Sequence, residues 1–210
     1  MRKLIYIILF ISTVTVLWPL LNLVMLSFAE PYYARQMGGF NIIPGAFTLM
    51  NYEILLSNPL VLRSLFNSVY MTLAGVFMSL TLTSIAAYVL TRPNLVFKNF
   101  FMGCLIIMMV FEPGLVQEFL VVQQLGLLDN PLAVILHRVV DVFYLIILMR
   151  FFEEVPASLI ESAHMEGAGH ITIFTKVMLP LAAPAIATIG FFYGVLRWNE
   201  FFRASIYLVD

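Results

Sequence analysis

Long runs of residues without a single charge restrict the fold of this chain more than any other feature. Residues 4–29 and 64–91 contain no Asp, Glu, Lys or Arg, and each run exceeds the ~20 residues with which a helix crosses a bilayer. A backbone inside hydrocarbon must satisfy its own hydrogen bonds, so such runs fold as helices. Charged residues make up only 11% of the sequence, too few to cover a soluble domain. We therefore expect an all-α, polytopic membrane helical bundle.

Five candidate membrane spans can be delimited. They cover residues 4–29, 64–91, 99–120, 132–152 and 182–208. The first run follows a short basic start and could be a secretory signal peptide, but its length and the lack of a clean cleavage site favour a span. The second run carries small residues suited to close helix packing, namely Gly75, Ser79, Thr83, Ser84 and Ala87. We expect a single transmembrane domain over residues 1–210.

Lysine and arginine in the loops predict the orientation. With the N-terminus inside, six basic residues fall on the inner face, namely Arg2, Lys3, Arg92, Lys98, Arg150 and Lys176. Two, Arg35 and Arg63, fall on the outer face. Because basic loops are retained in the cytoplasm, we expect a cytoplasmic N-terminus and a cytoplasmic loop at residues 153–180. Five spans would leave the C-terminus outside.

The loop at residues 153–180 differs from the others in its glycines, prolines and charges. Residues 153–165 predict a helix with one apolar face, formed by Val155, Leu159, Ile160 and Ala163. Gly167 and Gly169 permit a turn with positive φ after that helix. Residues 171–179 predict a second short helix that ends at Pro180. The pattern indicates a helix–turn–helix outside the hydrocarbon, with an ordinary interfacial loop as the alternative.

The spacing in this loop resembles the EAA motif of permease subunits of binding-protein-dependent ABC importers. That motif reads Glu-Ala-Ala, three residues, Gly, nine residues, Ile, one residue, Leu-Pro. The matching positions here are Glu161, Ser162, Ala163, Gly167, Val177, Leu179 and Pro180. Ser162 stands for an Ala and Val177 for the Ile, while the spacing is intact. The resemblance extends from about Trp18 to Asp210 and is strongest to permeases for carbohydrates and oligosaccharides.

The resemblance implies a fold, a role and a set of partners. The loop would be a cytoplasmic coupling helix, with ATPase-coupling residues Glu161, Ser162, Ala163, Gly167, Leu179 and Pro180. The partners would be a second homologous permease subunit, ATP-binding subunits, an extracytoplasmic solute-binding protein and the lipid bilayer of a bacterial inner membrane. ATP and Mg would bind to the ATPase, and no cofactor to this chain. The family has a sixth span that is absent here, so the sequence is a fragment or a short gene product.

The sequence offers no catalytic constellation. It has no Gly-x-x-x-x-Gly-Lys phosphate loop. The single cysteine, Cys104, excludes an intrachain disulfide, and the three histidines have no partners at metal-ligand spacing. A formal net charge of −1 without a basic run gives no reason to expect nucleic-acid binding. We expect a non-catalytic subunit without a metal site.

Ionisable residues inside predicted spans are costly and should face protein or a water-filled cavity. The predicted fourth span contains His137, Arg138 and Asp141. At spacings of three and four residues, these side chains would share a helix face. One interpretation is a structural ion pair inside the bundle. The other is a lining for the substrate path, in which Arg138 meets an anionic group of the cargo.

The distal part of the fifth span carries Trp198, Asn199 and Glu200. An indole face can pack on the apolar face of a sugar ring, while an amide and a carboxylate can form hydrogen bonds with its hydroxyl groups. Sugar-type permeases resemble this segment with a Trp-Asn pair. The alternative is that Trp198 belongs to an interfacial aromatic belt.

The function predicted from these features is import of an oligosaccharide or sugar derivative, powered by a separate ATPase. An ABC permease for an amino acid, a peptide or an ion is one alternative. A membrane scaffold without transport is another. Co-purification of an ATPase with the chain would distinguish a permease from a scaffold.

Overall fold

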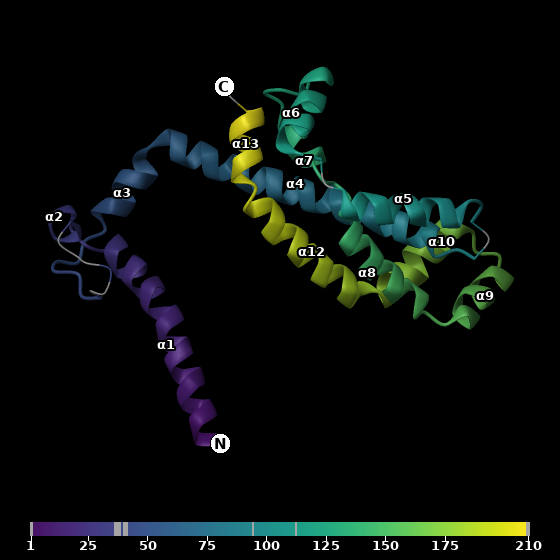
Figure 1. Ribbon diagram of the computed structural model, residues 1–210, viewed down its shortest axis with the longest axis horizontal. Helices are drawn as coiled ribbons and strands as arrows, with labels where there is room; N and C mark the ends of the chain where they lie inside the picture. Colours follow the sequence, from purple (N-terminus) through teal and green to yellow (C-terminus); the bar gives the residue numbers. More distant parts are fainter. Residues whose placement is uncertain (1, 36–38, 40–41, 94, 112, 209–210) are drawn as a thin grey trace. The chain divides into compact units, whose positions relative to one another are not determined.

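The computed structural model describes residues 2–35, 39, 42–93, 95–111 and 113–208 (Figure 1). The chain divides into two compact units, Met1–Phe66 and Asn67–Asp210. The described residues form helices and turns, with one isolated β-bridge between Ala29 and Phe47. The expectation of an all-α membrane-type fold is therefore confirmed.

The first unit contains the long helix α1 (Arg2–Ser27) and the short helices α2 (Pro31–Ala34) and α3 (Met50–Ser57). α1 runs through Pro19 and exposes its apolar side chains from Leu4 to Val24. At its C-terminal end, Asn51 donates hydrogen bonds from Nδ2 to the carbonyls of Ser27 and Ala29, at 3.1 and 2.8 Å. The side chain of α3 thereby satisfies carbonyls that the end of α1 leaves open.

The second unit begins within α4 (Pro59–Leu90), the longest helix, and contains nine further α-helices and one π-helix in the described residues. In chain order these are α5 (Lys98–Val110), α6 (Leu115–Gln124), α7 (Pro131–Leu136), α8 (Val142–Glu153), α9 (Ala157–Met165), α10 (His170–Ile173), the π-helix η1 (Phe174–Met178), α11 (Leu179–Leu181), α12 (Ala183–Trp198) and α13 (Phe201–Tyr207).

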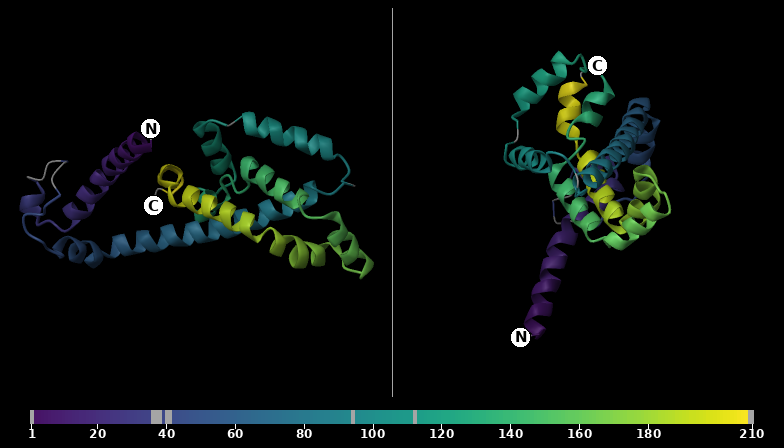
Figure 2. Two further views of the ribbon diagram at one scale, coloured as in Figure 1. Left: turned by 90° about the horizontal axis from the view of Figure 1, so that it is seen from below. Right: turned by 90° about the vertical axis from the view of Figure 1, so that its right-hand side faces the viewer.

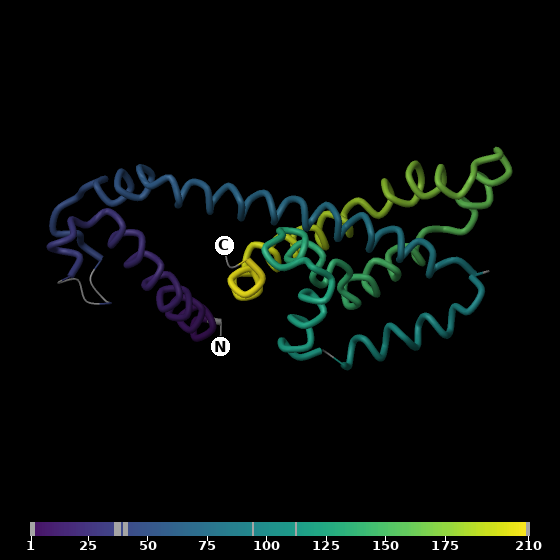
Figure 3. The backbone as a smooth tube through the Cα atoms, turned by 90° about the horizontal axis from the view of Figure 1, so that it is seen from above, coloured from purple at the N-terminus to yellow at the C-terminus, as the bar shows by residue number. Residues whose placement is uncertain are grey.

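The main core of this unit joins α4, α8 and α12 with the segment between α9 and α12. α8 packs against both α5 and α12. α9 lies at one end of the unit, and α6, α7 and α13 lie together at the other (Figures 2 and 3). The small residues predicted to pack α4 are buried, namely Gly75, Ser79, Thr83, Ser84 and Ala87. Four of them, Gly75, Ser79, Thr83 and Ala87, recur every four residues and make a stripe that admits close approach of neighbouring helices.

Two described helices are long and apolar enough to cross a membrane, Lys3–Ser27 and Pro59–Leu90. They correspond to the first two predicted spans. Two bent helix pairs raise the number to as many as four if each pair is one span. Each of the other three predicted spans contains a break between helices.

The three interruptions lie at defined points of the chain. The predicted span at 99–120 is split between α5 and α6, where Gly114 is the extended N-cap of α6. The span at 132–152 is split at residues 137–141, and the span at 182–208 at Asn199 and Glu200. At 137–141 the chain leaves the helix when Arg138 adopts a φ of +46°, a conformation that a side chain disfavours.

Candidate functional site

A cavity of about 530 Å³ opens beside the interruption in the fourth predicted span. Its described lining comprises Met108, Met109, Phe111, Pro113, Glu118, Arg138, Val140, Asp141, Val142 and Phe143. Two of the predicted path residues, Arg138 and Asp141, therefore line one cavity together with Glu118, which comes from α6. The described lining combines one cationic and two acidic side chains with apolar walls, a composition suited to a polar solute with an apolar face.

Asp141 is the N-cap of α8. Its Oδ1 accepts hydrogen bonds from the backbone N–H groups of Phe143 and Tyr144, at 2.9 and 3.4 Å. The helix ends at Leu136, so His137, Arg138 and Asp141 do not share a helix face. The prediction from i,i+3 and i,i+4 spacing was wrong in this respect. A capping carboxylate stabilises the start of a helix, which gives Asp141 a structural role at the cavity wall.

An ionic cluster borders the same cavity. Arg203 of α13 donates from Nε to Glu118 at 2.9 Å and from Nη1 to Glu200 at 3.1 Å. His137 Nδ1 lies 3.9 Å from the same Glu118 oxygen. The Glu118 and Glu200 side chains are only 13% and 10% exposed. Glu200 is therefore engaged with Arg203. The i,i+3 spacing of Glu200 and Arg203 could have indicated this pair. Glu118 stands out as a charge inside a predicted span, but no local pattern pairs it with Arg203, which lies on another helix.

Trp198 and Asn199 lie at the C-terminal end of α12, outside the described lining of this cavity. The Trp198 side chain is 55% exposed. Asn199 is the C-cap residue, and its Nδ2 donates to the carbonyl of Val195 at 2.7 Å. The structure thus separates the two halves of the predicted substrate path, with Arg138 and Asp141 at the cavity and the Trp-Asn pair on an exposed surface.

The turn after α9 has the geometry of a Schellman motif. Ala168 N–H donates to the carbonyl of Ala163, and Gly167 N–H to that of His164, both at 2.9 Å. Gly167 has a φ of +83°, the left-handed conformation that this motif requires at the residue after the helix cap. Gly169 has an ordinary φ of −75° and precedes α10 as its N-cap. Only one of the two glycines is therefore required by the backbone.

α9 turns one face to the core and leaves the other open. Ile160 and Ala163 pack against the main core, whereas Leu159, predicted on the same face, is 45% exposed. Glu161 and Ser162 are exposed on the other side of the helix. A surface with exposed acidic and hydroxyl groups is thus held rigidly by apolar contacts beneath it.

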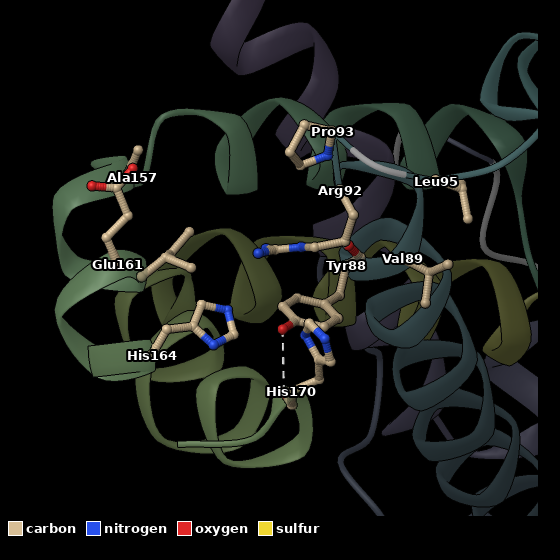
Figure 4. Close-up of a pocket in the computed structure, with 10 residues that line it drawn as sticks. Tyr88, Val89, Arg92, Pro93, Leu95, Ala157, Glu161, His164 and His170 are labelled. Carbon is tan, nitrogen blue, oxygen red and sulfur yellow. Dashed lines mark hydrogen bonds between the residues drawn. The ribbon is translucent and has the colours of Figure 1, made fainter. Parts of the chain in front are cut away.

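Glu161 lines a second cavity, of about 670 Å³, between α9 and the end of α4 (Figure 4). Arg92 lies over the ring of Tyr88, with its guanidinium carbon 4.1 Å from the ring centroid. Tyr88 donates from its hydroxyl to the carbonyl of His170 at 3.2 Å. The hydrogen bond from Tyr88 attaches the start of α10 to α4, which forms part of the main core.

The predicted stop at Pro180 is also corrected. The chain remains helical through Leu179 and Pro180, and bends by 80° between residues 181 and 183. Leu179 N–H bonds to the carbonyl of Phe174, an i to i−5 bond of a π-helix. A proline has no N–H, and its ring crowds the carbonyl four residues earlier. The wider π turn that precedes Pro180 accommodates both effects.

Comparisons with known proteins agree on one family. Residues 73–208 match the family described as "Binding-protein-dependent transport system inner membrane component". The polygalacturonan/rhamnogalacturonan transport system permease protein YtcP of Bacillus subtilis is 40% identical over 91% of this chain and 67% of its own length. The arabinooligosaccharides transport system permease protein AraQ of Halalkalibacterium halodurans is 30% identical over 91% of this chain and 70% of its own.

A solved structure is similar over nearly the whole chain. It is a crystal structure of a bacterial ABC transporter involved in the import of the acidic polysaccharide alginate. The two chains superpose with a TM-score of 0.93 at 30% sequence identity, covering 99% of this chain and 74% of the other.

Proposed function

The chain belongs to the family of binding-protein-dependent transport system inner membrane components, and we propose that this member imports oligosaccharides that carry carboxylate groups. It is a membrane permease subunit of an ABC importer and is not itself catalytic. Membership of the family implies an ATPase and a solute-binding protein as partners.

The observation that carries the choice of cargo is Arg138 in the wall of the cavity. A guanidinium pairs with carboxylates through two parallel hydrogen bonds, a geometry that a neutral sugar cannot match. Support also comes from the similar proteins. One bears polygalacturonan and rhamnogalacturonan in its name, and another imports the acidic polysaccharide alginate. A uronic acid is the simplest cargo consistent with these features.

Trp198 and Asn199 are proposed to meet the same cargo farther along the path. Both are exposed at the end of α12. The indole would lie against a sugar ring and the amide would bind a hydroxyl group. Glu200 is proposed to contribute through Arg203, which it holds at 3.1 Å.

The segment from α9 to α11 is proposed to couple this subunit to its ATPase on the cytoplasmic side. Glu161 and Ser162 offer an exposed polar surface, and Ala163 joins it to the core. Gly167 sets the turn. ATP and Mg would bind to the ATPase, whose movement the coupling helix would pass to the spans. Leu179 and Pro180 belong to the helical segment that would carry this movement.

The finer topology is part of the same proposal. Residues 1–210 would form a single membrane domain with a cytoplasmic N-terminus in a bacterial inner membrane. Five segments would cross the bilayer, three of them as interrupted helices. A second homologous permease would complete the path and cover part of the apolar surface that α1 exposes.

Uptake of labelled digalacturonate by vesicles that hold the assembled transporter tests the cargo. We expect uptake that requires ATP and the solute-binding protein. Unlabelled digalacturonate should compete, and a neutral disaccharide of the same length should not. Import of the neutral sugar without import of digalacturonate would refute the proposed cargo. Absence of an ATPase from the purified complex would instead refute the role as an importer subunit.

A further inference from the structure

The interruption at residues 137–141 leaves backbone groups without their helical partners inside the bundle. If α7 continued, the carbonyl of Val134 would accept a hydrogen bond from the N–H of Arg138. Instead Arg197 donates to this carbonyl from Nη1 at 2.9 Å. On the other side of the interruption, the N–H of Asp141 donates to the hydroxyl of Tyr193, also at 2.9 Å. Side chains of α12 thus replace bonds that the helix would have made.

Tyr193 and Arg197 are four residues apart on α12 and lie on the same face of it. Each is held from the opposite side by a hydroxyl group of α4. The Thr83 and Tyr193 hydroxyls are 2.8 Å apart, and Arg197 donates from Nη2 to Ser79 Oγ at 3.1 Å. Ser79 and Thr83 are themselves four residues apart. The result is a polar brace of four side chains, defined here as Ser79, Thr83, Tyr193 and Arg197, that connects α4 through α12 to both ends of the interruption.

The brace is buried. Tyr193, Ser79 and Thr83 have no exposed surface, and Arg197 is 6% exposed. Gly75 also belongs to this arrangement, because a Cβ there would lie 3.1 Å from Cδ of Arg197. A charged group inside a membrane bundle costs free energy and is usually found where it has a structural or functional role. The hydrogen-bond partners of Arg197 show its role here. It satisfies the carbonyl left open by the broken helix and does not contact the cavity.

We propose that Tyr193 and Arg197 are positioning residues of the transport path. They hold the interruption in one conformation, and the interruption in turn presents Arg138 and Asp141 to the cavity. α12 follows directly from the segment proposed to contact the ATPase. A displacement of that segment would therefore reach the cavity wall through two side chains. The effect on cargo binding rests on the proposed function, whereas the positioning of the interruption by Tyr193 and Arg197 does not.

The test measures access to the cavity wall without any cargo. In vesicles that hold the whole transporter, Val140→Cys in a Cys104→Ser background places a thiol in the lining. Its rate of reaction with a membrane-impermeant maleimide reports how often the interruption opens. Tyr193→Phe removes one hydroxyl and leaves the N–H of Asp141 unsatisfied. We expect it to change the labelling rate by roughly fivefold or more.

Tyr144→Phe is the matched control. Its ring centroid lies 4.9 Å from that of Tyr193, so the change removes a hydroxyl from the same neighbourhood and keeps both the ring contact and the hydrogen bonds of the brace. Equal changes of the labelling rate in the two variants would overturn the proposal, as would an unchanged rate for Tyr193→Phe. If the Tyr193→Phe variant fails to reach the membrane, the Thr83→Val variant tests the proposal in its place. It removes the hydrogen bond between Thr83 and Tyr193 and keeps the one from the Asp141 N–H to Tyr193. An unchanged rate for Thr83→Val would then overturn the proposal.

Uptake of digalacturonate supplies a second readout. A displaced cavity wall weakens cargo binding, so Tyr193→Phe should raise KM by a larger factor than it lowers kcat. A fall in kcat alone at unchanged KM would contradict positioning. Failure of the unaltered transporter to take up digalacturonate would refute only the proposed cargo, since the labelling experiment uses none.

Discussion

Arg197 donates a hydrogen bond to the backbone carbonyl of Val134, a residue 63 positions earlier in the chain. The bond completes the end of a helix that stops inside the bundle. Broken helices at membrane depth occur where the backbone is buried in protein or lines a water-filled cavity. Here Arg197 covers one side of the interruption, and the cavity lined by Arg138 and Asp141 opens on the other.

Gly75→Ala should destabilise the subunit by about 1–3 kcal/mol, the usual cost of overpacking. The new methyl group would lie 3.1 Å from Cδ of Arg197 and push the guanidinium away from its partners. Gly103→Ala is the control, because nothing lies within 4 Å of a Cβ at that position on α5. Thermal unfolding of the purified complex in detergent compares them. Equal unfolding temperatures would show that Arg197 tolerates displacement.

Gly167→Ala should cost about 1–2 kcal/mol, because a Cβ is disfavoured at a φ of +83°. We expect ATP-driven uptake to fall while the amount of complex in the membrane is maintained, since the turn is exposed. Gly167→Asp should be at least as damaging, and Gly167→Asn milder, because Asn tolerates the left-handed conformation. Gly169→Ala is the control, with a φ of −75° and open space around it. Comparable loss of uptake in the Gly169 variant would remove the special role of Gly167.

Arg138→Gln should slow uptake of digalacturonate about tenfold or more, because a charge-assisted pair to a carboxylate contributes ~1.5–3 kcal/mol. Binding of the ATPase and the membrane level should stay normal. Asp141→Asn should be tolerated, since Asn also caps a helix well, whereas Asp141→Ala should lower stability by about 1 kcal/mol. If Arg138→Gln lowers the amount of assembled protein, and Asp141→Asn added to it restores both assembly and uptake, the two residues form a structural pair.

Cysteine accessibility tests the orientation. In a Cys104→Ser background, the thiol from Ser158→Cys on α9 should react with an impermeant reagent only after the cytoplasmic side is exposed. That from Gly39→Cys should react in intact cells. Both positions are exposed in the structure, so failure to react reflects the side of the membrane. Reaction of the Ser158→Cys variant in intact cells would refute the coupling role of α9.

Features that depend on neighbouring residues could be predicted from the sequence. The small-residue stripe of α4 follows from identities four residues apart. The turn at Gly167 follows from one glycine at the end of an amphipathic helix. The interruption at residues 137–141 could not be predicted in this way, because His-Arg-Val-Val-Asp contains neither Gly nor Pro. Its partners, Tyr193 and Arg197, lie on another helix and give no local signal. Helical spacing was therefore assumed for residues 137–141, which are not helical.

The sequence indicated individual residues of the candidate site, but not which of them lie together. Arg138 and Asp141 were identified because charges are rare in membrane spans, and both line the cavity. Glu118 and Arg203 join the cavity border through contacts between α6 and α13, which no periodic pattern shows. Of the apolar face predicted for residues 153–165, Val155, Ile160 and Ala163 pack against the core, whereas Leu159, assigned to the same face by its spacing, is exposed.

The π-helix at Phe174–Met178 has a geometric consequence for everything that follows it. Its bond from Leu179 N–H to the carbonyl of Phe174 encloses one residue more than an α-helical bond does. Each residue of an α-helix advances the side chains by about 100° around the axis. The extra residue therefore sets the angular phase of α11, and of the bend that leads into α12, relative to α10. Removing one residue from the π-helix would break no contact of the brace directly. It would turn the direction of that bend by about 100° around the axis of α10 and so carry Tyr193 and Arg197 away from the helix ends that they complete.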